Sequence, residues 1–360
     1  MTFKKLKEKK VMILVASVSL VALILFGAVS KSNSFHAESK TKPTEQETTM
    51  NEIDRLVDDS NMFGSLVMMK NGEAIYTQSY GMADAEGKIK NDQDIIYPIA
   101  SLQKSMTAVM IAQLISEDKL TYDTTIDKFY EDLDHAEEVT VRDLIDHTSG
   151  FVMPEVASDS VLKTEQEQLE NALKTSEYNG NREFQYSNGN YSFLAGIIMK
   201  LDERSYEESL QTRILNPLHM KNTYLWSNLP KDVQLPKEYF YHEDKNYQTD
   251  TLVYSEELMS TLLGAGNVYA TAEDVAIFET SLNNGVLLKD EEYLELFGIQ
   301  HNDLMARMGN ISSQGAGGGY SSYVYGDITN QNVVVFLVNQ SSPTDSIPVM
   351  ENLYQQLLEF

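Results

Sequence analysis

Runs of β-prone residues predict strands near both ends of the chain. Residues 64–69 and 74–80 are short β-prone runs, and the Asn-Gly pair between them is typical of a hairpin turn, because both turn positions require positive φ. A second strand pair is predicted at 320–325 and 333–338, with its turn around 326–327. The run 333–338 is apolar at every position, which indicates a central strand covered on both faces.

Apolar residues at helical spacing fill the middle of the chain and its end. They predict helices after Thr140, over 191–201, over 271–282 and over 347–358. Strands at both ends with helices between them indicate an α+β (mixed α/β) fold. We expect one mixed layer built from both termini, with a mainly helical subdomain inserted at about 118–263.

The amino-terminal residues 1–30 form a separate module. Residues 4–10 hold five lysines and one glutamate, and the uncharged run that follows is twenty residues long. At ~1.5 Å per residue, a helix of that length spans the ~30 Å hydrocarbon core of a bilayer, and the lysines favour a cytoplasmic start with the rest of the chain outside. We expect a retained anchor, with a cleaved signal peptide as the alternative. The polar residues 31–50 predict a flexible linker, followed by a folded domain over 51–360.

Composition excludes several classes of function. The chain has 360 residues, no cysteine, and a net charge of −26, which disfavours binding to nucleic acid. Its six histidines are scattered without metal-ligand spacing, so we expect neither a metal site nor a cofactor.

The first candidate for chemistry is the segment Ser101-Leu102-Gln103-Lys104, where a helical pattern begins. Residues three apart are neighbours on a helix, so Lys104 can take the Ser101 proton, and the helix N-terminus offers free backbone N–H groups. An ordinary N-cap serine with a solvated lysine would show the same spacing. The motif therefore gains weight only in combination with others.

Two further segments carry matching residue types. Tyr186-Ser187-Asn188 precedes a predicted helix; a tyrosine whose pKa is lowered by a lysine can act as a general base and acid, and an asparagine amide can orient the lysine and a substrate carbonyl. A plain capping turn is the alternative. The glycine-rich run 313–320 leads into a predicted strand, where glycines allow close approach of a substrate and a backbone N–H can stabilise an oxyanion. The alternative there is a flexible loop.

Taken in this order, the motifs resemble the serine β-lactamase and penicillin-binding-protein superfamily, in particular its class C-like branch. The resemblance extends over about residues 51–360. Three more stretches match signatures of that branch: Leu144-Ile145-Asp146-His147-Thr148-Ser149-Gly150, Pro217-Leu218-His219-Met220 and the segment 264–274. It implies a sandwich of an antiparallel sheet flanked by helices, with a helical subdomain and a cleft between the two.

The resemblance also implies residue roles. Ser101 would be the nucleophile, Lys104 its base, and Tyr186 the acid/base for the leaving group. Asn188 would support the substrate, and the oxyanion hole would use the backbone N–H groups of Ser101 and Ala316. His147 is expected to be structural.

The third motif departs from the family pattern. Aligned on Gly315, it reads Ser313-Gln314-Gly315, without the usual Lys or His, although a shift of one or two residues is possible. Neutral side chains anchor a free carboxylate less well than a cation does, so an already esterified carboxyl group fits better.

The chain resembles the teichoic acid D-alanine esterases of this superfamily. We therefore expect a serine hydrolase at the outer face of the cell membrane that releases D-alanine from teichoic or lipoteichoic acid, and that β-lactams can acylate. The alternatives are a D,D-carboxypeptidase, a weak penicillin-binding protein or β-lactamase, and a non-catalytic wall-binding or sensor protein. A secreted form is the alternative location.

Overall fold

The computed structural model describes residues 44–249, 255–298 and 310–360, with side chains omitted at 310–314 and 316–317. The predicted membrane segment 1–30 lies outside these residues. Among the helices that are described, none has the length and apolar character needed to cross a membrane.

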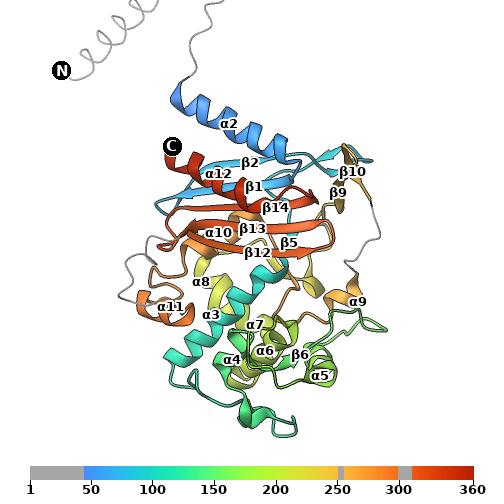
Figure 1. The fold of residues 1–360 in the computed structure, drawn as a ribbon, viewed down its shortest axis with the longest axis vertical. Helices are drawn as coiled ribbons and strands as arrows, with labels where there is room; N and C mark the ends of the chain where they lie inside the picture. The colour runs from blue at the N-terminus through green and yellow to red at the C-terminus, as the bar shows by residue number, and fades with distance from the viewer. Residues whose placement is uncertain (1–43, 250–254, 299–309) are drawn as a thin grey trace, which may run out of the picture. The chain divides into compact units, whose positions relative to one another are not determined.

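Along the chain, most helices fall between the strands near its two ends (Figure 1). The α-helices are α2 (Glu45–Ser60), α3 (Gln103–Ser116), α4 (Val141–Ile145), α5 (Glu165–Thr175), α6 (Asn188–Asp202), α7 (Tyr206–Leu210), α8 (Asn216–Leu218), α9 (Glu256–Met259), α10 (Ala272–Thr280), α11 (Asp290–Leu296) and α12 (Ser346–Glu359). Shorter helical turns that matter below are η1 (Ala100–Leu102), the π-turn η4 (Gln211–Leu215) and η5 (Trp226–Asn228).

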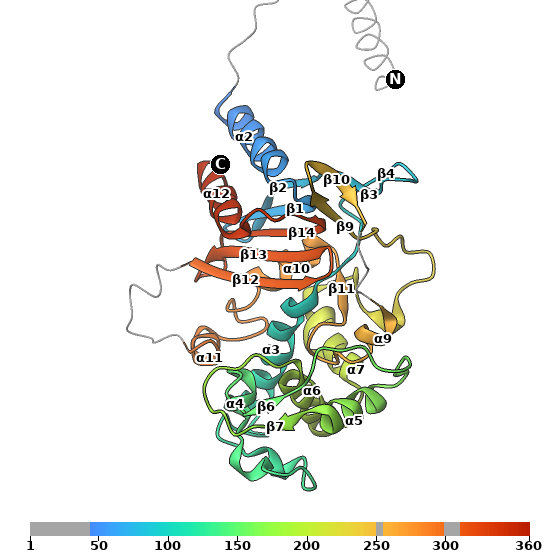
Figure 2. The same ribbon diagram turned by 45° about the vertical axis from the view of Figure 1, so that its right-hand side comes forward.

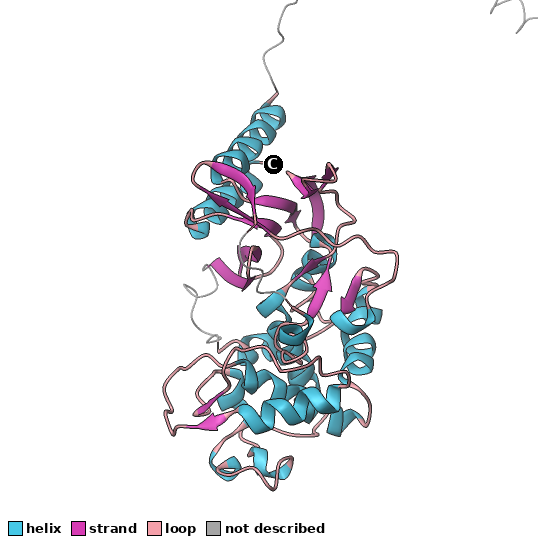
Figure 3. Ribbon diagram, turned by 90° about the vertical axis from the view of Figure 1, so that its right-hand side faces the viewer, coloured by secondary structure: helices cyan, strands magenta, loops and turns pink. Residues whose placement is uncertain are grey.

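The strands form one large sheet and several small ones (Figure 3). They are β1 (Phe63–Lys70), β2 (Glu73–Ser79), β3 (Met82–Asp84), β4 (Ile89–Lys90), β5 (Tyr97–Pro98), β6 (Phe151–Val152), β7 (Glu177–Tyr178), β8 (Thr223–Leu225), β9 (Tyr239–His242), β10 (Lys245–Gln248), β11 (Val268–Ala270), β12 (Asn310–Gly317), β13 (Tyr320–Asp327) and β14 (Val333–Ser341).

The large sheet joins the two ends of the chain, as the sequence predicts. Strand β14 lies between β13 and β1 and is antiparallel to both, with Val335 opposite Val324 on one side and Val67 on the other. The β1–β2 hairpin turns at Asn71 and Gly72, whose φ values of 54° and 77° confirm the predicted turn. Strand β12 continues the sheet beyond β13.

Helices cover both faces of this sheet (Figure 2). Helices α2 and α12 pack on one face, where Ile53, Leu353 and Phe336 belong to one apolar cluster. Helix α10 packs on the other face, whose apolar side chains continue into the large core around α3 and α6. This arrangement confirms the mixed sheet-and-helix fold, and it buries α3 along most of its length.

Four local expectations differ from the structure. Helix α2 begins at Glu45, inside the segment 31–50 predicted as a linker. Its first turns are polar, so they show no apolar period that would have predicted a helix there. The turn between β13 and β14 follows residue 327 rather than lying at 326–327, since Gly326 still pairs with Val333. In α12, Ile347 and Leu358 are exposed although both fit the apolar period.

The fourth difference concerns the subdomain predicted at 118–263. It contains helices α4 to α9, but it also holds β9 and β10, which join the large sheet through parallel pairing of Tyr239 with Gln340 in β14. Its β8 pairs with β11 in a small three-stranded sheet. The aromatic run at 239–241 has strong β propensity, which helical spacing in the surrounding sequence conceals.

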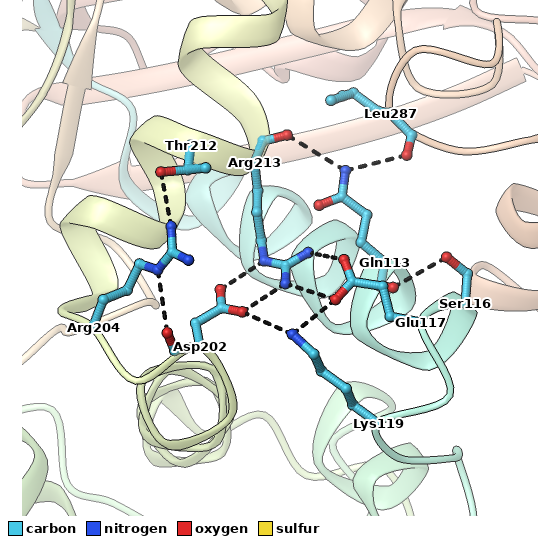
Figure 4. A network of polar contacts seen from close by, with 9 residues as sticks. All are labelled: Gln113, Ser116, Glu117, Lys119, Asp202, Arg204, Thr212, Arg213 and Leu287. Atoms are coloured by element: carbon cyan, nitrogen blue, oxygen red, sulfur yellow. Dashed lines mark hydrogen bonds and ion pairs between the residues drawn. The ribbon is translucent and has the colours of Figure 1, made fainter.

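A partly buried ion-pair network fastens the end of α3 to the end of α6 (Figure 4). Arg213 on η4 lies 2.6 Å from an Asp202 carboxylate oxygen and 2.7 Å from a Glu117 oxygen, and the Asp202 side chain is only 2% exposed. Burial opposes ionisation of Asp202, but the hydrogen bonds and charge of Arg213 outweigh it and lower the Asp202 pKa to about 2. Lys119 completes the network through contacts to both carboxylates.

Candidate active site

Ser101 lies in a tight turn directly before helix α3. It occupies the middle of the 3₁₀ turn η1, which runs into α3 at Gln103, so the serine sits just before the helix. The preceding residue, Ala100, has a φ of 46°, a left-handed conformation that is costly for a residue with a Cβ. Such strain persists where the surrounding structure imposes it, and it is common at functional sites.

Lys104 lies one turn further along and points back at Ser101. Its ammonium nitrogen is 3.0 Å from Ser101 Oγ, and it donates to Asn188 Oδ1 at 2.8 Å and to the Ala265 carbonyl at 2.7 Å. The side chain is buried, and these three hydrogen-bond acceptors are all neutral oxygens. Burial lowers the Lys104 pKa to about 7, and the charge of Glu155 opposes this shift only in part. Near neutral pH the amine can therefore accept a proton.

Tyr186 approaches Ser101 from the opposite side. Its hydroxyl lies 2.6 Å from Ser101 Oγ, and the Lys104 nitrogen lies 4.8 Å from the centre of its ring. The expectation that Lys104 lowers the Tyr186 pKa is wrong in direction. Tyr186 is 46% exposed as a whole, but partial burial of its hydroxyl end against Ser101 raises its pKa; the hydrogen bond with Ser101 opposes the rise and the charge of Glu155 adds to it. Tyr186 is therefore a protonated phenol, suited to donating a proton.

Helix α6 begins at Asn188, two residues after Tyr186 and three residues earlier than the helix predicted over 191–201. Ser187 is the N-cap, and its hydroxyl accepts from the Met153 backbone N–H at 3.0 Å. This arrangement fixes Tyr186 at the mouth of the helix and points the Asn188 amide oxygen at Lys104. Ser187 makes no side-chain capping hydrogen bond at this helix start, so a plain capping turn does not describe the segment, and Asn188 instead accepts from the Lys104 amine.

His147 packs behind Tyr186, with the two ring centres 4.6 Å apart. Its Nδ1 accepts from the Ser187 backbone N–H at 3.2 Å and lies at the same distance from the Asn190 amide nitrogen. Burial, reinforced by the charge of Lys104, lowers the His147 pKa to about 4. A neutral imidazole in this position supports Tyr186, in keeping with a structural role.

The glycine-rich segment forms a strand rather than a loop. Strand β12 pairs along its length with β13, and Gly318 and Gly319 make the turn between them. At Gly315 the strand meets η1 so closely that a Cβ would lie 2.8 Å from the Ser101 backbone nitrogen and 2.5 Å from the Ile99 oxygen. The structure therefore brings Gly315 to Ser101 and places Ala316 next to it on the strand; the Ala316 oxyanion contact stays a prediction.

Two contacts of the site have no counterpart in the sequence prediction. The Ala265 carbonyl belongs to a segment held by Gln103, whose amide accepts from the Asn267 N–H at 2.5 Å and donates to the Asn267 side chain at 3.1 Å. The match of 264–274 to a family signature indicates this segment, but a backbone carbonyl leaves no mark of its own in a sequence.

The second overlooked group is Glu155, on the loop after β6. Its negative charge raises the pKa of both Lys104 and Tyr186, which places it within electrostatic reach of the reaction centre. It follows His147-Thr148-Ser149-Gly150 closely, but nothing in its own sequence context distinguishes it from other surface glutamates. Elsewhere in the described residues, no group of three metal-ligating side chains occurs.

Together these side chains form an acyl-transfer centre. Ser101 Oγ contacts the Lys104 amine, which can be neutral near pH 7, on one side and the protonated Tyr186 phenol on the other. The amine can therefore take the serine proton while the phenol supplies a proton to a leaving group. The strained turn and the adjacent start of α3 leave the Ser101 backbone N–H beside the reacting oxygen. This geometry matches what a serine acyltransferase or hydrolase with a Ser-x-x-Lys and a Tyr-x-Asn motif requires, and the catalytic roles of these residues stay predictions.

This class of site agrees with the family to which the chain belongs. The beta-lactamase family model matches residues 52–358, so the chain is a member of the beta-lactamase family. The teichoic acid D-alanine hydrolase of Staphylococcus aureus is 24% identical over 318 residues, which cover 85% of this chain and 77% of that protein. The homologues of this chain thus include named hydrolases of the serine β-lactamase and penicillin-binding-protein superfamily. This finding confirms the resemblance to that superfamily predicted from the sequence motifs.

Solved structures confirm the fold. The crystal structure of FmtA from Staphylococcus aureus superposes with a TM-score of 0.73 at 22% identity and covers 89% of this chain and 90% of that one. The D-amino acid amidase of Ochrobactrum anthropi SV3, complexed with L-phenylalanine amide, gives a TM-score of 0.68 at 22% identity, covering 87% and 98%. A penicillin-binding protein from Bacillus halodurans gives 0.63 at 19% identity, covering 85% and 99%.

Proposed function

We propose that this protein hydrolyses D-alanyl esters of a cell-wall teichoic or lipoteichoic acid through an acyl-enzyme on Ser101. The observation that carries the proposal is the pair of contacts on Ser101 Oγ, 3.0 Å to the Lys104 amine and 2.6 Å to the Tyr186 hydroxyl. Similarity to a teichoic acid D-alanine hydrolase over 85% of the chain favours this ester among possible acyl substrates.

In the first half of the reaction, neutral Lys104 takes the Ser101 proton as the serine oxygen attacks the ester carbonyl. The resulting oxyanion is stabilised by the Ser101 backbone N–H and by a second donor on β12, which we assign to Ala316. The tetrahedral intermediate then expels the polyol oxygen. Tyr186 gives that oxygen its proton and regains one from Lys104, so D-alanine is left esterified to Ser101 and both side chains return to their starting states.

In the second half, water attacks the D-alanyl ester of Ser101. Lys104 and Tyr186 remove a proton from the water and return one to the serine oxygen as it leaves. Free D-alanine and the resting enzyme result, without a metal or cofactor in any step.

Charge in the site supports an acyl group that carries an ammonium and lacks a free carboxylate. Glu155 acts electrostatically on Lys104 and Tyr186, so its carboxylate can attract the free amine of a D-alanyl ester. The third motif, Ser313-Gln314-Gly315, offers no cation for a terminal carboxylate. An esterified D-alanine meets both conditions, whereas a peptide ending in D-alanine presents the carboxylate that the third motif lacks a cation to hold.

The proposed location is the outer face of the cell membrane. It rests on the basic residues 4–10 and the long uncharged run after them, which would anchor the chain and leave residues 51–360 outside. A teichoic acid substrate lies on that side of the membrane, so the location and the proposed reaction agree.

The test is release of D-alanine by the full-length protein. We expect release from D-alanylated lipoteichoic acid, no release from a pentapeptide ending in D-Ala-D-Ala, and loss of release in Ser101→Ala. We also expect a β-lactam to acylate Ser101, with no adduct in the variant. Release from the pentapeptide alone would replace the proposal with a D,D-carboxypeptidase, and absence of any adduct or release would favour a non-catalytic wall-binding protein.

A further inference from the structure

A second cavity lies beyond the active site, on the far side of the β12–β13 turn. Its volume is about 580 Å³, and it lies between η5, α9, β11 and the start of β13. Three aromatic rings and two carboxylates stand out in its lining, which includes Trp226, Leu235, Glu238, Glu256, Tyr269 and Tyr320. None of these side chains has a role in the mechanism above.

The two carboxylates converge on one part of this cavity. The charges of Glu256 and Glu238 both act on Tyr269, whose pKa burial raises to about 12 with their help. Glu238 is only 6% exposed, and its carboxylate accepts a hydrogen bond from the Gly319 backbone N–H in the β12–β13 turn. Burial raises the pKa of Glu238, so a cation in the cavity would favour its ionised form.

The cation in the lining does not neutralise these carboxylates. The Lys237 ammonium lies 3.0 Å from Asp84 and 3.7 Å from Glu86, and its side chain is half exposed. Within the described part of the chain, neither Glu238 nor Glu256 forms an ion pair at 4.0 Å or less. Carboxylates beside aromatic faces are the combination that binds an organic ammonium, through charge and cation–π attraction, and they repel a phosphate.

The cavity is linked to the catalytic centre along two elements. Gly318, whose Cβ position falls against Glu238, lies in the turn that ends β12, three residues beyond Gly315, which corresponds to at most about 10 Å at the rise of a strand. On the other side, the loop that carries Glu155 is tied to α9, because Ser158 donates to the Glu257 carbonyl at 3.1 Å. Negative charge therefore acts at the catalytic centre, through Glu155, and in the cavity, through Glu238 and Glu256.

We propose that this cavity is a second ammonium subsite, which binds the free amine of another D-alanyl unit on the same polymer while one unit reacts at Ser101. The inference rests on the proposed function. A D-alanylated polymer carries an ammonium on each esterified repeat, so one chain can occupy both sites. The enzyme would thus recognise its polymer through its amines, despite the negative charge that protein and phosphates share.

The experiment measures binding and turnover with the full-length protein. Affinity for D-alanylated lipoteichoic acid, and for the same polymer stripped of its esters by mild base, is measured in Ser101→Ala alone and with Glu256→Gln added. Glu257→Gln is the matched control, since it removes the same charge one residue away, outside the cavity lining. Turnover is measured in parallel, in the Ser101 protein, on the polymer and on D-alanine methyl ester, which has the same scissile bond and no second ammonium.

We expect Glu256→Gln to weaken binding of the alanylated polymer by about fivefold and to raise its KM by a similar factor, as expected for loss of one partly exposed ion pair. The stripped polymer, the methyl ester and the Glu257→Gln control should show no such change. Equal effects of the two variants, or an equal effect on the methyl ester, would overturn the subsite. If the wild type releases no D-alanine while the alanylated polymer still binds in a Glu256-dependent way, the proposed reaction fails and the ammonium site stands.

Discussion

Two cations, the buried Lys104 on α3 and the partly buried Arg213 on η4, differ in the groups that surround them. Lys104 donates to neutral oxygens, and burial lowers its pKa to about 7. Arg213 lies against the carboxylates of Asp202 and Glu117, and its pKa is raised, chiefly by the hydrogen bond with Asp202 (Figure 4). Both cations are withdrawn from solvent, Lys104 more fully than Arg213, and the charge of the partners decides whether the cation can give up its proton or is fixed as a permanent charge.

The largest expected effect is on turnover when the Lys104 amine is removed. Lys104→Met should reduce D-alanine release by about 10³-fold, within the usual contribution of a general base, while the circular dichroism spectrum stays that of the wild type. Lys119→Met removes a cation of the Arg213 network and should leave turnover unchanged. Similar losses in the two variants would show that Lys104 acts through folding.

Removal of the other cation should instead affect stability. Arg213→Met leaves Asp202 buried without its main partner, and breaking a buried pair in this way costs about 3 kcal/mol in the free energy of unfolding. Urea denaturation measures this loss, and the folded fraction should keep its normal kcat. Arg204→Met, at a neighbouring exposed arginine, serves as control and should change stability by less than about 0.5 kcal/mol. A loss of kcat in folded Arg213→Met would contradict the separation.

The sequence predicts the local half of the catalytic centre and misses much of the long-range half. Ser101 and Lys104 are three residues apart, so helix geometry brings them together, and the central strand at 333–338 is evident from its continuous apolar run. The Ala265 carbonyl reaches Lys104 across 161 residues and has no side chain to mark it. Tyr186 could be placed only by family resemblance, because S-N before a helix is also an ordinary cap.

Partial burial explains why the predicted direction of the Tyr186 pKa shift was wrong, because a sequence does not show burial directly. The sequence pairs Tyr186 with a lysine and so predicts a lowered tyrosine pKa, but in the structure burial raises it. The glycine-rich segment 313–320 was similarly ambiguous between loop and strand. Only its pairing with β13, and the close approach of Gly315 to Ser101, settle it as a strand beside the nucleophile.

The two cations should also separate by pH. Turnover that requires neutral Lys104 should rise with pH through about 7 and fall about tenfold per unit below it. The pKa values of Asp202 and Glu117 are lowered to about 2, so their contribution to stability is present above about pH 4 and is lost as pH falls from 4 towards 2. Lys104 has linkage of the same sign in a higher pH range, since its folded pKa also lies below the unfolded value, so stability should rise between about pH 7 and 10.

The measurement combines initial rates with urea denaturation between pH 3 and pH 9, with Ser101→Ala as a blank for spontaneous ester hydrolysis at each pH. A folded fraction that falls together with turnover below pH 7 would mean that the rate profile reports unfolding. A rate profile with no inflection between pH 6 and pH 8 would remove Lys104 as the titrating base.

The smallest expected effect concerns Glu155, whose negative charge acts on Lys104 and, in the proposed function, attracts the substrate ammonium. Glu155→Gln should lower kcat/KM for D-alanine methyl ester by about fivefold, because one partly exposed charge pair with the substrate ammonium is lost. The methyl ester of D-lactate, which has a hydroxyl in place of the ammonium, should be unaffected at pH 8, where Lys104 is mostly neutral. Since Glu155 raises the Lys104 pKa, the variant should also shift the rate profile to lower pH. Equal losses on both esters would mean that Glu155 acts on Lys104 or Tyr186 rather than on the substrate amine.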